Sequence, residues 1–200
     1  MSPPDLGNRV ARTARALGVE LPIVQAGMGG VATPRLAAAV SEAGALGTIA
    51  LYKLSGAQVE QMLRDALRRT ACRLSVNVIP EVAGRLLDEQ LRAVFAITDR
   101  PLVVNSYAPP PEAAARAVLE AGHTLLVQVG TLDQARQAVE LGAGILACQG
   151  VEAGGHLLGT DRLAELLAQV GREFPEVPLL GAGGVADGAA TREALRAGAG

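Results

Sequence analysis

The chain alternates between short apolar runs and stretches with helical periodicity, and this alternation limits the folds open to it. The apolar runs are Ile23–Ala26, Leu46–Leu51, Leu74–Ile79, Leu102–Asn105, Leu125–Val129, Gly144–Cys148 and Pro178–Ala182. Between them, apolar side chains recur at spacings of three and four in residues 34–43, 56–70, 83–97, 111–121, 132–141, 160–173 and 187–197. Seven strand-then-helix units in a row predict an α/β fold built on a parallel sheet.

Two architectures satisfy this pattern: a doubly wound open sheet and a (β/α)8 TIM barrel. Periodicity alone does not choose between them. A length of 200 residues fits one α/β domain. As a barrel, the sequence would be truncated after the seventh βα unit. Residues 1–20 would then be an N-terminal lead-in segment, and residues 21–200 a barrel without its eighth strand and helix.

Composition excludes several classes of function. The chain has 18 basic and 20 acidic residues, two Phe, two Tyr and no Trp, so it has neither the charge nor the aromatic side chains of a nucleic-acid-binding protein. It shows no signal-peptide pattern and no apolar run long enough to span a membrane, which predicts a cytoplasmic protein. Cys72 and Cys148 lack the spacing of a zinc site or a disulfide framework. We expect buried thiols, with a catalytic thiol at Cys148 as the alternative.

Polar residues and glycines cluster where the expected strands end. Gln25, Asn77 and Asn105 stand at or near the ends of three apolar runs, and Gln128 lies within a fourth. The sixth run is followed by the polar, glycine-rich segment 149–156. Because the carboxyl ends of parallel strands converge on one site, these groups predict a shared pocket lined by neutral amides. Such a pocket suits a planar, hydrogen-bonding ligand that carries a phosphate.

The glycines of residues 181–185 lie between the last expected strand and a helix that starts near Asp187. Glycine allows backbone N–H groups to approach an anion, and a helix N-terminus adds a favourable dipole. The segment therefore resembles a phosphate-binding loop. An ordinary tight turn is the alternative interpretation.

His156 is one of two histidines and lies in a loop beside Gly154, Gly155 and Gly159. An imidazole can exchange a proton near neutral pH, which suits a general base. A loop histidine that makes a hydrogen bond is the alternative. No second histidine or carboxylate stands at ligand spacing, so we expect no metal site.

At these residues the sequence resembles the nitronate monooxygenase family, formerly called 2-nitropropane dioxygenases. These proteins are FMN-dependent TIM-barrel flavoproteins. The resemblance extends from about residue 21 to residue 200, and it is carried by residues 22–28, 36–47, 76–78, 152–156 and 181–185. Two departures stand out: Gly27 replaces a proline common in the family, and Leu157-Leu158-Gly159 follows the histidine where many members have a basic residue and glycine.

The resemblance implies a catalytic role for His156 and a set of residues around FMN. The loop after the first expected strand, residues 25–28, would lie against the flavin ring. Two amides would bind the polar edge of the flavin or its ribityl chain. Glycines would line the pocket and hold the phosphate. In that order, these residues are Gln25, Ala26, Gly27, Met28, Asn77, Gln128, Gly154, Gly155, Gly183 and Gly184.

The resemblance implies an FMN-dependent oxidoreductase that oxidises alkyl nitronates with O2. The alternative is an NAD(P)H-dependent FMN reductase of an enoyl thioester, as in enoyl-acyl-carrier-protein reductases, or of quinones. An alternative from another class is a truncated, non-catalytic barrel fragment. The physiological substrate, the electron donor and the oligomeric state stay open.

Overall fold

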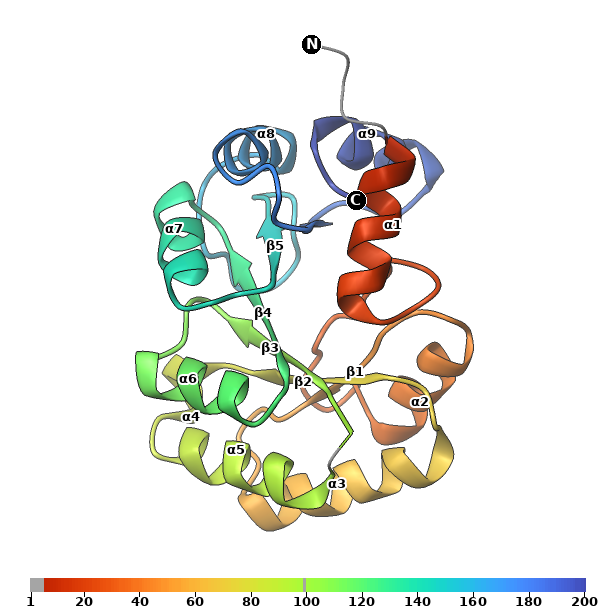
Figure 1. Ribbon diagram of the computed structural model, residues 1–200, viewed down its shortest axis with the longest axis vertical. Coiled ribbons are helices and arrows are strands. Elements are labelled where there is room, and N and C mark those ends of the chain that lie inside the picture. Colours follow the sequence, from red (N-terminus) through yellow and green to blue (C-terminus); the bar gives the residue numbers. More distant parts are fainter. Residues whose placement is uncertain (1–5, 99) are drawn as a thin grey trace.

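The sheet in the computed structural model, which describes residues 6–98 and 100–200, is parallel and follows the order of the sequence (Figure 1). Its strands are β1 (Gly47–Ala50), β2 (Leu74–Val78), β3 (Val103–Tyr107), β4 (Thr124–Val129), β5 (Ile145–Gln149) and β6 (Leu179–Ala182). Each strand pairs in parallel with the next, and the sheet curls as a barrel wall does. The predicted barrel is confirmed, and the open doubly wound sheet is excluded, because strand order never reverses.

Helices follow the strands on the outer face of the sheet (Figure 1). They are α2 (Pro34–Glu42), α3 (Gly56–Arg69), α4 (Pro80–Ala83), α5 (Leu86–Ile97), α6 (Glu112–Glu120), α7 (Leu132–Glu140), α8 (Leu163–Glu173) and α9 (Gly188–Ala197). Side-chain caps begin several of them. Ser55 and Gln58 form a capping box at α3, and Thr131 caps α7 through the backbone N–H of Gln134.

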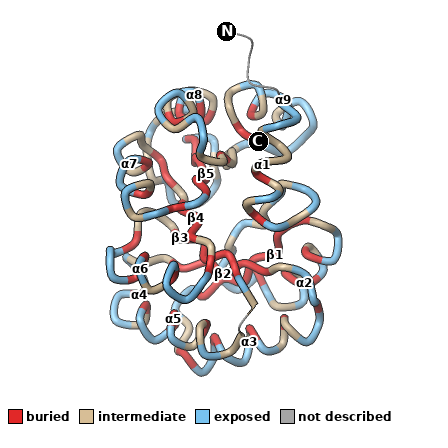
Figure 2. The backbone as a smooth tube through the Cα atoms, viewed as in Figure 1, coloured by how far each residue is buried: buried red, intermediate tan, exposed pale blue. Residues whose placement is uncertain are grey.

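The sheet separates two apolar clusters, as the alternation of side chains along a strand requires. Buried residues follow the strands in Figure 2. The larger cluster joins the outward-facing strand residues to the helices. The smaller one lies on the inner, concave face and includes Leu46, Val103, Leu126, Ile145 and Ala147. Towards the carboxyl ends of the strands, the inner face changes from apolar to amide side chains.

The N-terminal segment contributes more than the expected lead-in. Residues 6–17 form helix α1 (Leu6–Leu17), and Leu17 is fully buried in the inner apolar cluster. This helix lies on the other side of the sheet from the outer helices, beside the chain's C-terminal residues (Figure 1). Its apolar contact closes the amino-terminal end of the inner face, so α1 belongs to the domain that residues 21–200 were expected to form alone.

The first expected strand, Ile23–Ala26, is reduced to a single bridge between Val24 and Leu46. Two backbone hydrogen bonds accompany it, from Gln25 N to Leu46 O and from Leu46 N to Ile23 O. Pro22 has no N–H to donate, and Gly27 follows closely, so the segment is too short to extend the ladder. The backbone still runs parallel to β1, as a barrel strand would.

At the other edge of the sheet, Gly200 N donates to Leu179 O over 2.9 Å. The first residue of β4 makes the same kind of hydrogen bond to the neighbouring chain segment: Thr124 N donates to Leu102 O at 2.9 Å. Residue 200 therefore lies beside the start of β6 in the position of a neighbouring parallel strand.

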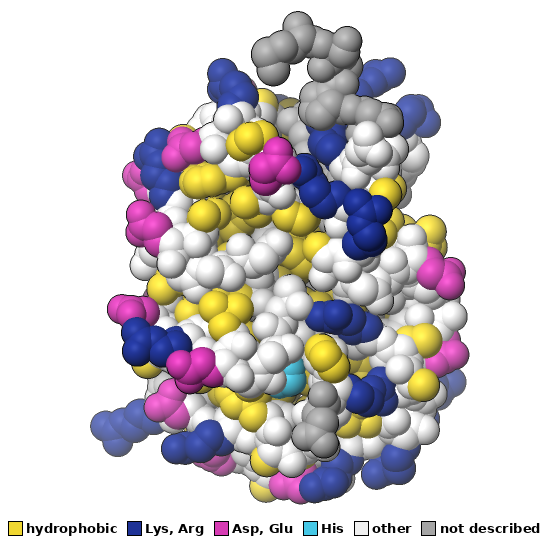
Figure 3. Space-filling view, viewed as in Figure 1, with side chains coloured by type: hydrophobic (Ala, Val, Ile, Leu, Met, Phe, Trp, Pro, Cys, Tyr) yellow, Lys and Arg dark blue, Asp and Glu magenta, His cyan; other side chains and the backbone are white. Residues whose placement is uncertain are grey.

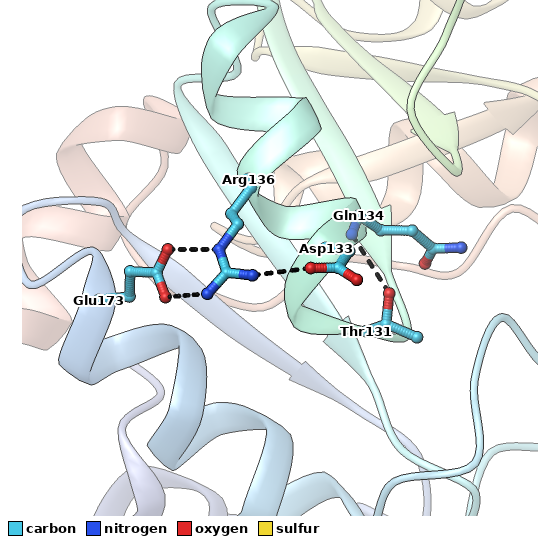
Figure 4. Close-up of polar contacts among 5 residues, drawn as sticks. All are labelled: Thr131, Asp133, Gln134, Arg136 and Glu173. Carbon is cyan, nitrogen blue, oxygen red and sulfur yellow. Dashed lines mark hydrogen bonds and ion pairs between the residues drawn. The ribbon is translucent and has the colours of Figure 1, made fainter.

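An exposed ion-pair group connects α7 with α8 (Figure 4). The Arg136 guanidinium donates to both carboxylate oxygens of Glu173, at 2.7 and 2.9 Å, and also to Asp133. Because all three side chains face solvent, we expect this group to contribute little to stability.

Candidate active site

Five polar side chains lie at the inward-facing ends of four neighbouring strands. Asn77 of β2 pairs in register with Asn105 of β3, and Tyr107 of β3 pairs with Gln128 of β4. Gln149 ends β5. Asn77, Asn105 and Gln149 are buried, whereas Tyr107 and Gln128 are half-buried. The predicted convergence of neutral amides on one end of the sheet is therefore present in the fold.

Two buried amide oxygens, one in this group and one on Gln25 nearby, have no donor among the described residues. Asn77 Nδ2 donates to Asn105 O at 3.1 Å, and Gln25 Nε2 donates to Thr48 O at 3.0 Å. These bonds orient both amides, but Gln25 Oε1 and Asn105 Oδ1 are left buried without a partner. An unpaired buried acceptor costs free energy, so both oxygens favour a ligand with N–H or O–H groups.

The loop of residues 25–28 lies directly over Asn77. A Cβ atom on Gly27 would be 2.4 Å from Cγ and from Oδ1 of Asn77, so only glycine fits above this amide as it is placed. Ala26 and Met28, on either side of Gly27, are both exposed. Met28 O ends the loop by accepting from Val31 N and Ala32 N. Gly27, which departs from the family's usual proline, thus has a steric reason in the contact with Asn77.

His156 lies in the loop between β5 and α8, and its side chain is exposed. No hydrogen bond joins its imidazole to another described residue. Gly154 and Gly155 precede it, and a Cβ atom added to either would have no neighbour within 4 Å, so the space around them is open. The imidazole is accessible to a small molecule at the same end of the sheet as the amides.

Gly183 and Gly184 both have positive φ, +123° and +67°, which glycine adopts without strain. Their Cβ positions would meet Ala153 N at 2.9 Å and Glu152 Cβ at 3.1 Å, so they pack against the start of the histidine loop. The N-terminus of α9 contributes less to anion binding than expected. Asp187 already accepts hydrogen bonds from Ala189 N and Ala190 N, at 2.9 and 2.8 Å. An anion would therefore depend on the glycine backbone.

Three members of this site are absent from the set of FMN-binding residues that the resemblance implied: Asn105, Tyr107 and Gln149. The sequence could have indicated two of them, because side chains two residues apart in a strand lie on one face, and this places Asn105 and Tyr107 together on β3. The paired register then aligns them with Asn77 and Gln128.

The alternative that Cys148 is a catalytic thiol is wrong. Its side chain is fully buried in the outer apolar cluster, and burial raises the pKa of the thiol to about 12. The group is therefore a neutral thiol at physiological pH. Cys72, expected to be buried as well, is exposed, because it lies in the turn between α3 and β2.

Glu152 fixes the entry to helix α8. Its Oε2 accepts from Leu163 N at 3.0 Å, and this hydrogen bond holds the pKa of the carboxyl below its usual range. Because the pKa is lower in the folded protein than in the unfolded chain, the charge stabilises the fold at neutral pH. This contribution is lost as the pH falls through the lowered pKa.

We expect Glu152→Ala to lower the free energy of unfolding by about 1 kcal/mol near pH 7, as loss of a helix cap does. The deficit should shrink on acidification, which urea unfolding at a series of pH values would measure. Glu165→Ala, a first-turn residue of the same helix, is the matched control. A deficit that is independent of pH would contradict the assignment.

Comparison with known proteins identifies the family. A sequence profile described as nitronate monooxygenase matches residues 11–120 and 107–200. The chain belongs to the nitronate monooxygenase family. This is a family of flavin-dependent oxidoreductases, in agreement with the curled parallel sheet and the amide-lined strand ends.

Individual relatives agree with this assignment. The nitronate monooxygenase of Pseudomonas aeruginosa is 31% identical over 94% of this chain and 66% of its own length. Among solved structures, FabK from Thermotoga maritima has a TM-score of 0.84 and 31% identity, over 94% of this chain and 58% of its own. A nitroalkane oxidase from Streptomyces ansochromogenes has a TM-score of 0.80 and 31% identity, over 93% and 65%. The chain thus spans about two thirds or less of these proteins.

The outer surface is mixed in charge and partly apolar. Acidic and basic side chains are interspersed over the face in Figure 3, and hydrophobic ones gather between α7–α8 and α1. The segments that follow the strands, helix α4 among them, expose further apolar side chains, at Met28, Val31, Val82, Val151, Leu157 and Val185. Among residues 6–98 and 100–200, no helix is both long and apolar enough to cross a membrane.

Proposed function

We propose that this protein is an FMN-dependent nitronate monooxygenase, in which residues 21–200 supply seven of the eight βα units of the barrel. The observation that carries the proposal is that His156 and the amides of four strand ends lie at the same end of the sheet in a chain of this family. The substrates are a small alkyl nitronate and O2. Two nitronates and one O2 give two carbonyl products and two nitrite ions.

The residues present fit FMN. Gln25 Oε1 and Asn105 Oδ1 are buried acceptors without a donor among the residues that the structure describes, and a flavin ring edge offers an N–H flanked by carbonyl groups. Asn77 and Gln128 would hold the polar edge or the ribityl chain, Gln25 to Met28 would lie against the ring, and Gly183 with Gly184 would contact the phosphate. When bound, FMN supplies the electron-transfer chemistry, and the protein supplies binding and orientation.

His156 supplies the proton chemistry in this proposal. Its exposed imidazole can accept the α-proton of a neutral nitroalkane, which generates the nitronate, or donate a hydrogen bond to the nitro oxygens. Gly154 and Gly155 leave open space beside it for a small substrate. The neutral amides add no fixed charge that would repel an anionic nitronate.

The test is anaerobic mixing of the full-length, flavin-loaded protein with propionate 3-nitronate and, separately, with NADH. We expect the nitronate to change the flavin spectrum, and air to release nitrite. Rapid bleaching by NADH without nitrite release would reject the monooxygenase and support the second candidate.

That second candidate is an NAD(P)H-dependent FMN reductase of an enoyl thioester or a quinone. The similarity to FabK and the apolar side chains around the strand ends favour it, because a larger apolar substrate would cover them. A non-catalytic barrel fragment is the remaining alternative. It is rejected if residues 1–200, purified alone, retain a yellow flavin.

Gly27→Ala tests the contact between the loop of residues 25–28 and Asn77. The added Cβ would displace the Asn77 amide and break its bond to Asn105 O. We expect the Kd for FMN to rise by about tenfold, the cost of roughly one hydrogen bond. Fluorescence titration of the apoprotein measures this change. Gly171→Ala, within α8, should leave FMN affinity unaltered; an equal loss in both variants would show a general folding defect instead.

A further inference from the structure

The loop that carries His156 is tied down at its ends but has no regular structure of its own. Gly150 N donates to Ala182 O at 2.9 Å, and Val151 N donates to Asp161 O at 2.9 Å. The middle of the loop is rich in glycine, which gives it many accessible backbone conformations. The placement of His156 therefore depends on contacts made to the middle of the loop.

Leu158 and Gly159 pack against Gly130, and two side chains from the sheet contact the loop at His156 itself, where both reach the same atom. Tyr107 Oη donates to His156 O at 2.7 Å, and Gln149 Nε2 donates to His156 O at 3.0 Å. Leu158 N in turn donates to Gln149 Oε1 at 2.9 Å. The carbonyl of His156 is thus held from β3 and from β5, on either side of the strand that carries Gln128.

We propose that Tyr107 and Gln149 are positioning residues that fix the backbone of His156 and, through it, the point from which the imidazole extends. This inference rests on the proposed function of His156. The imidazole makes no hydrogen bond with the described residues, so no side-chain partner orients it. Its reach toward a substrate is set by the backbone that these two side chains hold.

The electrostatics of Tyr107 agree with a donor role. Burial, with a smaller contribution from the charge of Glu81, raises the pKa of the phenol. The hydroxyl keeps its proton at neutral pH and donates it to the hydrogen bond with the carbonyl of His156. Tyr107 is therefore not available in this arrangement as an acid toward substrate.

The two donors share one acceptor, so we expect the effects of removing them on loop order and turnover to be non-additive. Loss of one bond should loosen the loop, and loss of both should release it. A displacement of about 1 Å can lower turnover by up to about 10²-fold, because a proton acceptor must lie within hydrogen-bonding reach.

The first measurement is amide hydrogen exchange in residues 153–159 of the full-length, flavin-loaded protein. Tyr107→Phe keeps the ring and removes the hydroxyl. We expect exchange in this segment to rise by about fivefold, the value of one hydrogen bond, with β3 and β5 unchanged. Ser106→Ala is the matched control: it removes the hydroxyl that donates to Ala108 O at 2.8 Å and should leave the loop unaffected. Unchanged exchange in Tyr107→Phe would overturn the proposal.

The second measurement separates positioning from direct contact with substrate. Tyr107→Phe should lower kcat by about tenfold with little change in KM, and Gln149→Met combined with it should lower kcat further. In a His156→Asn background, Tyr107→Phe should have no additional effect. A tenfold loss that persists there would mean that Tyr107 acts on substrate itself, which contradicts the proposal.

The two proposals can fail separately. A wild-type protein that turns over no nitronate would reject the proposed function, while the exchange experiment would still test whether the two side chains restrain the loop.

Discussion

His156→Asn is expected to lower kcat for nitronate oxidation by about 10²–10⁴-fold, the range typical for removal of a general acid or base. Asparagine keeps a polar side chain of similar reach but cannot accept a proton near neutral pH. The side chain is exposed and makes no bond with the described residues, so its replacement should not disturb the loop. The Tyr107 and Gln149 contacts involve only the backbone carbonyl, which the variant retains.

The measurement is steady-state nitrite release, with the flavin content of each preparation determined from its absorbance. We expect full flavin occupancy in His156→Asn. Thr160→Ala is the control within the same loop, because Thr160 is exposed and no hydrogen bond connects its side chain to a described residue. An unchanged kcat/KM in His156→Asn would reject a catalytic role for His156.

Gly47→Ala is expected to have the largest effect on stability. A Cβ at this first residue of β1 would be 1.8 Å from Ala37 O and 2.5 Å from Ala37 C. These atoms belong to the backbone of α2, which cannot rotate away as a side chain can. Overpacking of this kind costs on the order of 3 kcal/mol, because the helix and the strand must separate.

Urea unfolding followed by circular dichroism would measure the loss. Gly144→Ala is the matched control, since Gly144 stands just before β5 and its Cβ would meet nothing closer than Thr124 Cγ2 at 3.7 Å. We expect that variant to lie within about 1 kcal/mol of wild type. Equal stability of the two variants would show that α2 can move away from β1, contrary to the tight packing at Gly47.

Much of the fold was predictable because it depends on patterns within each segment. The expected runs from Leu46 onward correspond to β1–β6, since buried parallel strands need continuous apolar residues. Helix α1 was not expected. Its polar face and its place before the first apolar run gave no sign of a partner, and Leu17 becomes part of the core only when the sheet curls around it.

The candidate site shows the same division. Gln25, Asn77 and Gln128 were predicted from their places at or near strand ends, and the fold brings the strand ends together. Two features follow from distances between segments far apart in the sequence: Gly27 lies on Asn77, and Gln25 Oε1 has no donor within residues 6–98 and 100–200. The carboxylate of Asp187 at the start of α9 was visible in the sequence, but its bonds to two backbone N–H groups were not.

The sequence by itself determined the parallel α/β architecture, the family resemblance and the neutral, glycine-rich character of the site, because these depend on residue type and local period. Only the tertiary structure decided which groups meet. Tyr107 and Gln149 share the carbonyl of His156 because β3 and β5 flank a common strand in a curled sheet. Sequence spacing does not encode that curvature, since it arises from the twist of the strands and the stagger of their register across the sheet.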